Sequence, residues 1–244
     1  EDVKKLPELQ KIDHYNYVDY TSKWFRNKEW YEQLLNHCEH LEEIYINGGE
    51  PTLIKEHFYL LEKLIEKGKA KDISLLYNIN VTLLPDNFLE LLRQFKHVKL
   101  QLSIDDIGDR NYYIRYPSDW ETVIENMATI RQERFDVSIT QTLSILNICN
   151  IGNFFSFFND IPVEVNMVYS PNYLHVSNLH EKLKPLALEQ IDKIPDQTTK
   201  HKILYELNRS PLSTTEQGLK FISMMDSVRN LDVTKHLLEY KGII

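Results

Sequence analysis

Five short stretches of the chain alternate apolar and polar positions and are rich in β-branched and aromatic residues, which is the pattern of β-strands. Polar or turn-forming residues follow most of them. The intervals between the stretches are each long enough for one helix that returns the chain to the start of the next strand. The predicted strands are Glu43–Asn47, Ile73–Asn80, Val98–Ile104, Val137–Ser144 and Val163–Tyr169.

Apolar residues at helical spacing fill these intervals. In the first interval, for example, Phe58, Leu61 and Leu64 fall on one helical face. The helices predicted between the strands are His57–Lys67, Pro85–Phe95 and Asp119–Arg134. Strand–helix alternation of this kind gives a parallel α/β sheet with helices outside it, arranged either as a barrel or as a doubly wound sheet.

Both ends of the chain differ from this alternating middle. Residues 1–42 hold an aromatic-rich stretch and a predicted helix near Lys28–His40. After about residue 180 the strand pattern stops. The helices predicted there are Leu183–Ile194, Thr199–Asn208 and Thr214–Asn230. We therefore expect a lead-in at residues 1–42, a β/α region at 43–180 and a helical C-terminal extension at 181–244.

The composition is that of an ordinary globular protein. Of the 244 residues, 42% are hydrophobic and 26% are charged, which excludes collagen-like, coiled-coil and wholly disordered chains. The net charge of −8 argues against broad electrostatic binding to nucleic acid or to an anionic membrane. The apolar runs are far shorter than the ~20 residues of a membrane helix. We expect a soluble, cytoplasmic protein with neither nucleic acid nor membrane as a partner.

Candidate chemistry gathers where the predicted strands end, the edge at which parallel α/β folds bind ligands. Gly48 and Gly49 follow the first strand and allow a ligand to approach the backbone closely, and Glu50 adds a carboxylate that can accept from an ammonium group. The second strand ends in Asn78 and Asn80. The third strand brings Ser103 and Asp105 to one face, where a hydroxyl and a carboxylate suit a ribose or an amino acid.

Plainer interpretations stand beside these. A Gly-Gly turn also joins a strand to a helix without binding anything, and paired amides also cap loops. Ser103 and Asp105 equally suit solvation and helix capping. The convergence of polar residues on successive strand ends is a stronger indication of a site than any one of them.

Four motifs in this order resemble the radical S-adenosylmethionine (SAM) superfamily, and most closely its twitch domain-containing group. They are Ile46–Pro51 (INGGEP), Tyr77–Asn80 (YNIN), Leu102–Asp105 (LSID) and Ile114–Trp120 (IRYPSDW). The resemblance covers roughly residues 41–185 and, more faintly, Phe221–Leu231. It implies an α/β fold that is a partial TIM-like barrel of parallel strands, followed by a helical C-terminal region.

The resemblance also implies site residues. In the superfamily the GGE turn binds the methionyl amino group of SAM, which corresponds to Gly48, Gly49 and Glu50. Ser103 and Asp105 resemble positions that contact the ribose or carboxylate. Asn78 and Asn80 match an asparagine-bearing strand end that lines the same cavity. SAM and a [4Fe–4S] cluster are the implied cofactors, and a flavodoxin or ferredoxin is the implied electron donor.

The chain departs from the superfamily at the cluster loop. The CxxxCxxC motif that normally precedes the GGE strand is absent, because Cys38 and Cys149 are the two cysteines of the sequence. We expect both to be free thiols. Either the chain is a fragment that begins after its cluster loop, which the missing start methionine favours, or it is a relative without a cluster. A fragment would leave the edge of strand Glu43–Asn47 exposed, as in an open partial barrel.

Three functions therefore stay open. The first is the core of a radical SAM enzyme, which cleaves SAM reductively to a 5′-deoxyadenosyl radical when joined to its cluster-binding segment and acts on an unknown substrate, for which a peptide or protein is an analogy. The second is a cluster-less barrel that binds SAM or a nucleoside without catalysis. The third is a barrel hydrolase that uses carboxylates such as Glu50, Asp105 and Glu164 as acid and base.

Overall fold

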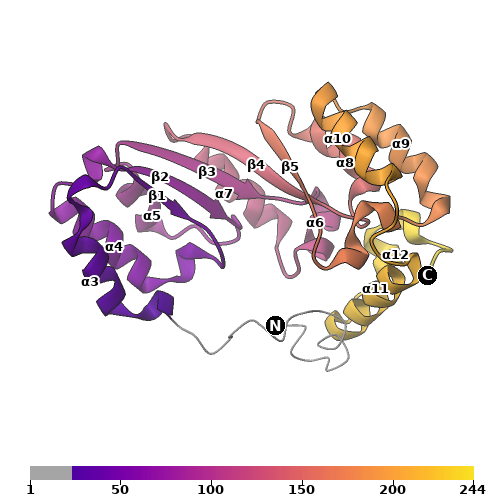
Figure 1. Cartoon of the computed structure of the whole chain (residues 1–244), viewed down its shortest axis with the longest axis horizontal. Helices are drawn as coiled ribbons and strands as arrows, with labels where there is room; N and C mark the ends of the chain where they lie inside the picture. Colours follow the sequence, from indigo (N-terminus) through magenta and orange to yellow (C-terminus); the bar gives the residue numbers. More distant parts are fainter. Residues whose placement is uncertain (1–23) are drawn as a thin grey trace. The chain divides into compact units, whose positions relative to one another are not determined.

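The computed structural model describes residues 24–244, so residues 1–23 of the predicted lead-in lie outside the described part (Figure 1). The chain forms two compact units. Residues 24–103 and 121–139 make up what we call the N-terminal unit, and residues 104–120 and 140–244 make up the C-terminal unit. The predicted boundaries at residues 42 and 180 do not coincide with this division and stay predictions.

A five-stranded sheet runs in the order β1-β2-β3-β4-β5. Its strands are β1 (Glu43–Ile46), β2 (Ser74–Ile79), β3 (His97–Ser103), β4 (Asp136–Leu143) and β5 (Val163–Met167). All five strand predictions are confirmed to within two residues at each end. The parallel α/β fold is confirmed too, and neighbouring strands follow each other in sequence as in a β/α barrel, whereas a doubly wound sheet reverses its strand order.

The first three strands pair in parallel with a defined register. β1 pairs with β2 in parallel, with Ile46 opposite Tyr77, and β2 pairs with β3 in parallel, with Ile79 opposite Leu102. Among the described residues β1 pairs with β2 alone, so its other edge is open there, as expected. Tyr45 on this strand is half exposed.

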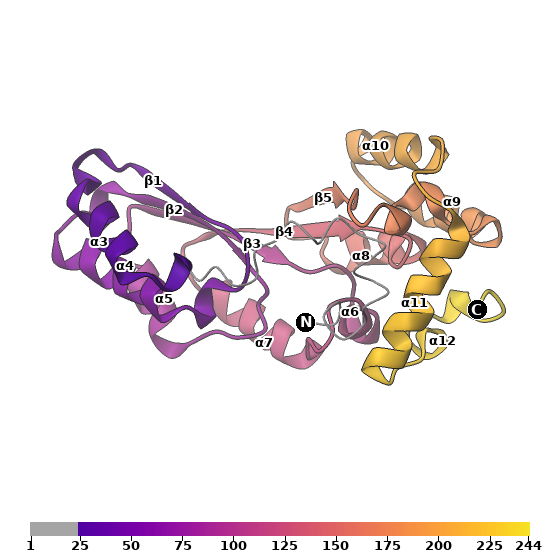
Figure 2. The same cartoon turned by 60° about the horizontal axis from the view of Figure 1, so that its bottom comes forward.

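Helices cover one face of the sheet in the N-terminal unit, as Figure 2 shows for α3, α4 and α5. The helices of this unit are α3 (Lys28–Asn36), α4 (Lys55–Glu66), α5 (Asp86–Leu92) and α7 (Trp120–Ile130), whose first residue belongs to the other unit. Leu75, Tyr77 and Ile79 of β2 are buried, whereas the residues between them are half-buried. The rings of Tyr77 and Phe88 of α5 meet edge to face at 5.5 Å, so this face packs against the helices.

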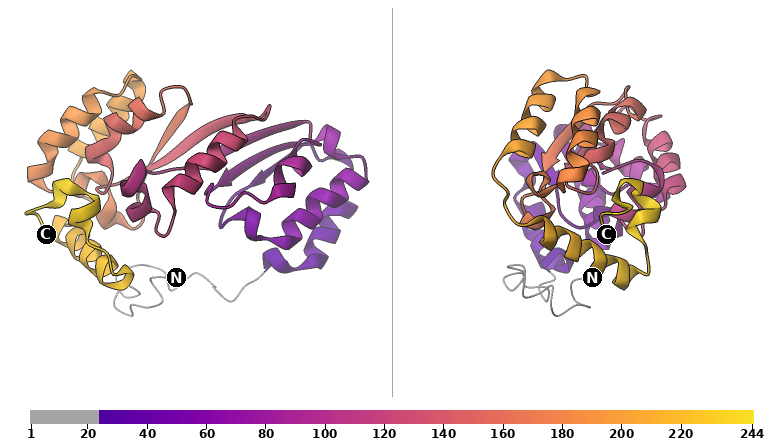
Figure 3. Two further views of the ribbon diagram at one scale, coloured as in Figure 1. Left: turned by 180° about the vertical axis from the view of Figure 1, so that it is seen from behind. Right: turned by 90° about the vertical axis from the view of Figure 1, so that its right-hand side faces the viewer.

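The C-terminal unit is mainly helical, as expected after the last strand (Figure 3). Its helices are α6 (Gly108–Ile114), α8 (Ile151–Phe157), α9 (Lys184–Asp192), α10 (Gln197–Asn208), α11 (Thr215–Arg229) and α12 (Val233–His236). The predicted start of α11 is correct, because Thr214 and Gln217 form a capping box there. Across residues 24–244, no helix is both long and apolar enough to pass through a membrane.

Single turns of 3-10 helix join many of these elements. They are η2 (Trp24–Arg26), η3 (Cys38–His40), η4 (Pro51–Leu53), η5 (Ala70–Asp72), η6 (Ile148–Asn150), η7 (Asn172–Leu174), η8 (Val176–Asn178), η9 (Glu181–Leu183) and η10 (Leu238–Tyr240). The predicted helix Lys28–His40 is thus α3 followed by η3.

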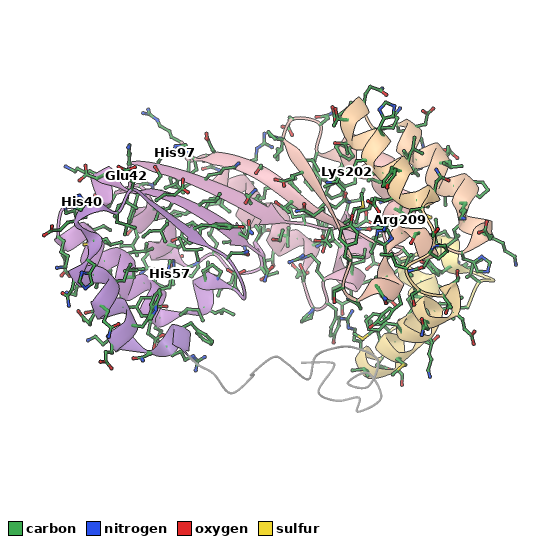
Figure 4. All side chains as sticks on the ribbon, viewed as in Figure 1. His40, Glu42, His57, His97, Lys202 and Arg209 are labelled. Atoms are coloured by element: carbon green, nitrogen blue, oxygen red, sulfur yellow. The ribbon has the colours of Figure 1, made fainter. Side chains whose placement is uncertain are left out.

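Beneath the sheet of the N-terminal unit, His57 of α4 is buried against Tyr77, with 2.8 Å between its Nε2 and the tyrosine hydroxyl (Figure 4). Burial lowers the pKa of His57 from 6.5 to about 4. The unfolded chain therefore takes up a proton at a higher pH than the folded protein does. The contribution of neutral His57 to stability is present above pH 6.5 and is lost as the pH falls toward 4.

We expect the free energy of unfolding to fall by about 3 kcal/mol between pH 6.5 and pH 4 because of His57. A pKa difference of one unit between the folded and unfolded states corresponds to about 1.4 kcal/mol. His57→Gln should flatten that part of the pH dependence, measured by urea denaturation across the window. His97→Gln is the matched control, since His97 is an exposed histidine of the same unit. An unchanged pH slope in His57→Gln would contradict the prediction.

Candidate functional site

The turn after β1 needs glycine at two successive positions. Gly48 has φ +89° and Gly49 has φ +60°, conformations that residues with a Cβ rarely adopt. A Cβ built on either residue meets no atom within 4 Å, so backbone conformation rather than crowding calls for glycine here. The turn therefore leaves space beside its peptide groups.

A small amide network holds this turn against β2. The backbone N–H of Gly48 donates to Asn47 Oδ1 at 2.8 Å. The side-chain nitrogen of Asn78 donates to the same Asn47 oxygen at 3.1 Å and to the hydroxyl of Tyr45 at 2.9 Å. Asn47 and Tyr45 were not among the predicted site residues, although Asn47 stands inside the INGGEP motif.

Glu50 ties the turn to the end of β2. One carboxylate oxygen accepts from the backbone N–H of Asn80 at 2.7 Å. The other accepts from the backbone N–H and the hydroxyl of Thr52, at 3.3 and 2.8 Å, and so caps η4. This carboxylate thus has a structural task in addition to any ligand contact.

The residue after Asn80 carries backbone strain. Val81 has φ +60°, which is a genuine outlier for a β-branched side chain. It is buried, and its carbonyl accepts from the Asn126 side chain of α7 at 2.9 Å. Backbone strain of this kind is common at ligand sites, where surrounding contacts hold it in place. The end of β2 is therefore a candidate ligand site.

A hollow of about 410 Å³ borders this turn within the N-terminal unit. Asn47, Gly48, Gly49 and Glu50 form one side of it. The other side is apolar and includes the rings of Phe25, Trp30 and Tyr31. Four predicted residues lie together at the neighbouring ends of β1 and β2, namely Gly48, Gly49, Glu50 and Asn80, and Asn78 is joined to them through Asn47. The hollow itself borders the three residues of the turn.

Ser103 and Asp105 lie on either side of the division between the units. Ser103 is the half-buried last residue of β3. Asp105 is buried in the C-terminal unit, where Oδ2 accepts from Arg115 Nη1 at 2.8 Å and Oδ1 accepts from the backbone N–H of Thr142 at 2.7 Å. Its carbonyl also accepts from the side chains of Gln141 and Asn147, at 2.9 and 2.8 Å. Asp105 therefore fastens the loop after β3 to β4.

A family model covers more than half of the chain. The radical SAM superfamily model matches residues 15–154. The chain belongs to the radical SAM superfamily.

Solved structures give the same fold. The chain is similar to native anSMEcpe with bound AdoMet, with a TM-score of 0.50 and 17% identity over 78% of this chain and 54% of that chain. It is also similar to a histidine-tagged form of anSMEcpe with bound AdoMet, with a TM-score of 0.50 and 15% identity over 75% of this chain and 50% of that chain. The chain thus spans about half the length of these two proteins. No curated protein matches it.

The thiols of this chain do not fit the superfamily's iron–sulfur cluster, which is held by several cysteine thiolates. Both cysteines are buried, and both are free, as expected. The Cys38 thiol donates to the carbonyl of Leu35 at 3.1 Å, and burial raises the pKa of Cys149 to about 12. The two belong to different units. In residues 24–244 no three His, Cys, Asp or Glu side chains gather as metal ligands.

Proposed function

We propose that the N-terminal unit binds SAM at the Gly48-Gly49-Glu50 turn. The observation that carries this proposal is the turn itself: two left-handed glycines at the carboxyl end of β1, inside the region that the superfamily model matches. Left-handed backbone without a Cβ allows peptide groups to approach the methionyl end of SAM closely. Glu50 fixes the turn against β2 through Asn80.

Other predicted residues take supporting roles in this proposal. Asn78 and Asn80 support the turn from the end of β2, through Asn47 and Glu50 respectively, and Ser103 of the same unit contacts the ribose or the carboxylate of SAM. Asp105 is left out of this SAM site, because it belongs to the C-terminal unit and both of its carboxylate oxygens are bonded there to Arg115 and Thr142.

Reductive cleavage of SAM to a 5′-deoxyadenosyl radical is the proposed activity of the protein when this chain is joined to a segment that holds the [4Fe–4S] cluster. A cluster held by that segment would supply the electron for the cleavage. The residues of this chain bind and orient SAM, whereas cysteines of the other segment hold the cluster. The twitch domain-containing subgroup, an electron donor of the flavodoxin or ferredoxin kind and a cytoplasmic location are further parts of the proposal.

Gly49→Val tests the turn. A β-branched residue restricts φ and fills the space that the methionyl group needs, so we expect SAM affinity to fall by about tenfold or more in isothermal calorimetry. Gly68→Val is the matched control, because Gly68 also has φ +71° and an open Cβ position but lies between α4 and β2. The control should share the backbone strain and keep its affinity for SAM.

Two outcomes would overturn the assignment of the turn. One is unchanged SAM affinity in Gly49→Val. The other is an equal loss of affinity in both variants, which would trace the effect to strain in the unit. Failure of the unsubstituted chain to bind SAM at all would reject the proposed function itself.

A further inference from the structure

A second hollow lies wholly within the C-terminal unit, at the carboxyl ends of three strands. Its volume is about 190 Å³. Asp105 stands two residues after β3, Thr142 is the next-to-last residue of β4, and Val168 directly follows β5. We call it the strand-end pocket. Its remaining wall includes Ile222 and Met225 of α11.

Several of the polar groups around this pocket are already bonded within the protein. Both carboxylate oxygens of Asp105 accept hydrogen bonds, as described above. The hydroxyl of Ser144 accepts from the backbone N–H of Leu146 at 3.2 Å. Arg229 donates to the carbonyl of Tyr113 at 3.0 Å, and its guanidinium lies 5.3 Å from the Tyr116 ring centre. Because these groups are bonded and most of the lining side chains are aliphatic or aromatic, the pocket is suited to an apolar ligand.

We propose that the strand-end pocket binds an apolar side chain of the substrate, about the size of one aromatic ring. Apolar cavities of about 150 Å³ take up benzene, so this volume suits one ring with a small substituent. The ring of Phe221, another wall residue, lies 5.0 Å from the ring of Tyr173, which adds aromatic surface to the site. The link to a substrate rests on the proposed function, since substrates of β/α barrels bind at the carboxyl ends of the strands.

The wall from α11 is a reason to assign the pocket to specificity. The superfamily match ends at residue 154, and α11 covers Thr215–Arg229. The strand ends therefore come mostly from the shared domain, while the helix that closes the pocket is outside the match. A pocket built in this way can select a substrate without changing the site that binds SAM.

The test is a titration of the full chain with toluene, followed by NMR of isoleucine and methionine methyl groups. We expect saturable shifts of the Ile222 and Met225 methyls. Met225→Phe should fill the pocket and weaken toluene binding by about tenfold or more. Met224→Phe is the matched control, because its neighbour Met224 is half-buried on the same helix and does not line the pocket.

A second variant covers the case in which Met225→Phe does not fold. Met225→Ala enlarges the pocket and should bind indole more tightly than the unsubstituted chain does. Absence of saturable shifts, or equal weakening by Met224→Phe, would overturn the proposal. Displacement of toluene by SAM would also overturn it, because the pocket would then be part of the SAM site. Toluene binding without any SAM binding would support an apolar ligand site in the strand-end pocket and would reject the proposed function.

Discussion

Arg110→Met should lower the free energy of unfolding by about 3–5 kcal/mol, because it removes one partner from a buried ionic network. Arg110 Nε donates to Asp106 Oδ2 at 2.7 Å. Its two terminal nitrogens donate to the oxygens of Glu239 at 2.9 and 2.8 Å. Asp106 has no exposed surface, and burial raises the pKa of its carboxyl although Arg110 favours the charged form.

The same arginine joins distant parts of the C-terminal unit. Asp106 follows β3, whereas Glu239 belongs to η10 near the end of the chain. Tyr240, next to Glu239, is buried and donates to the carbonyl of Ile145 at 2.8 Å. Loss of Arg110 would leave two largely buried carboxylates without their cation and would remove one of the contacts that hold this terminal segment.

Arg93→Met is the matched control for urea denaturation. Arg93 also forms a bidentate ion pair, with Glu133, but half of the Arg93 side chain is exposed. Exposed pairs are worth about 0–1 kcal/mol, so this variant should change stability little. Adding Asp106→Asn and Glu239→Gln to Arg110→Met should recover part of the loss, since both buried charges then disappear. Equal losses for Arg110→Met and Arg93→Met would contradict the argument.

Alternation of apolar and polar residues was enough to predict the sheet. Leu75, Tyr77 and Ile79 alternate with polar or half-buried neighbours because one face of β2 packs against helices and the other does not. Helix prediction failed for a helix too short to show an apolar period. The seven-residue α6 begins at Gly108 with a positive φ, and its Asn111 side chain accepts from the backbone N–H groups of Asp105 and Asp106. These bonds span only five and six positions, but a side-chain cap of this kind leaves no periodic pattern in the sequence.

Part of the candidate site was predictable from the sequence and part was not. The Gly-Gly turn was predictable, because consecutive glycines after a strand point to left-handed backbone. The partners of Glu50 were not, since Asn80 lies thirty positions away and donates through its backbone, which every residue except proline can do. Asn47 could have been found from its place in the motif, whereas nothing in the local sequence indicates that the β-branched Val81 adopts a positive φ.

Anaerobic reconstitution of this chain with iron and sulfide should give no [4Fe–4S] cluster, and no 5′-deoxyadenosine should form when SAM and a reductant are added. A cluster of this kind needs several thiolates close together. Cys38 is buried at η3 with its thiol bonded to a backbone carbonyl. Cys149 is buried at η6, and its raised pKa keeps it a thiol at neutral pH, so it is a poor metal ligand.

The measurement combines visible absorbance, EPR and chromatography of the reaction mixture. A double variant, Cys38→Ser with Cys149→Ser, is the control for iron that adheres without specific ligands. Iron uptake should be equal in the two proteins, and deoxyadenosine should be absent from both. A stoichiometric cluster with deoxyadenosine in the unsubstituted chain, lost in the double variant, would show that these two thiols do reach one metal centre. The same chain extended by a segment with a CxxxCxxC motif should assemble the cluster and cleave SAM.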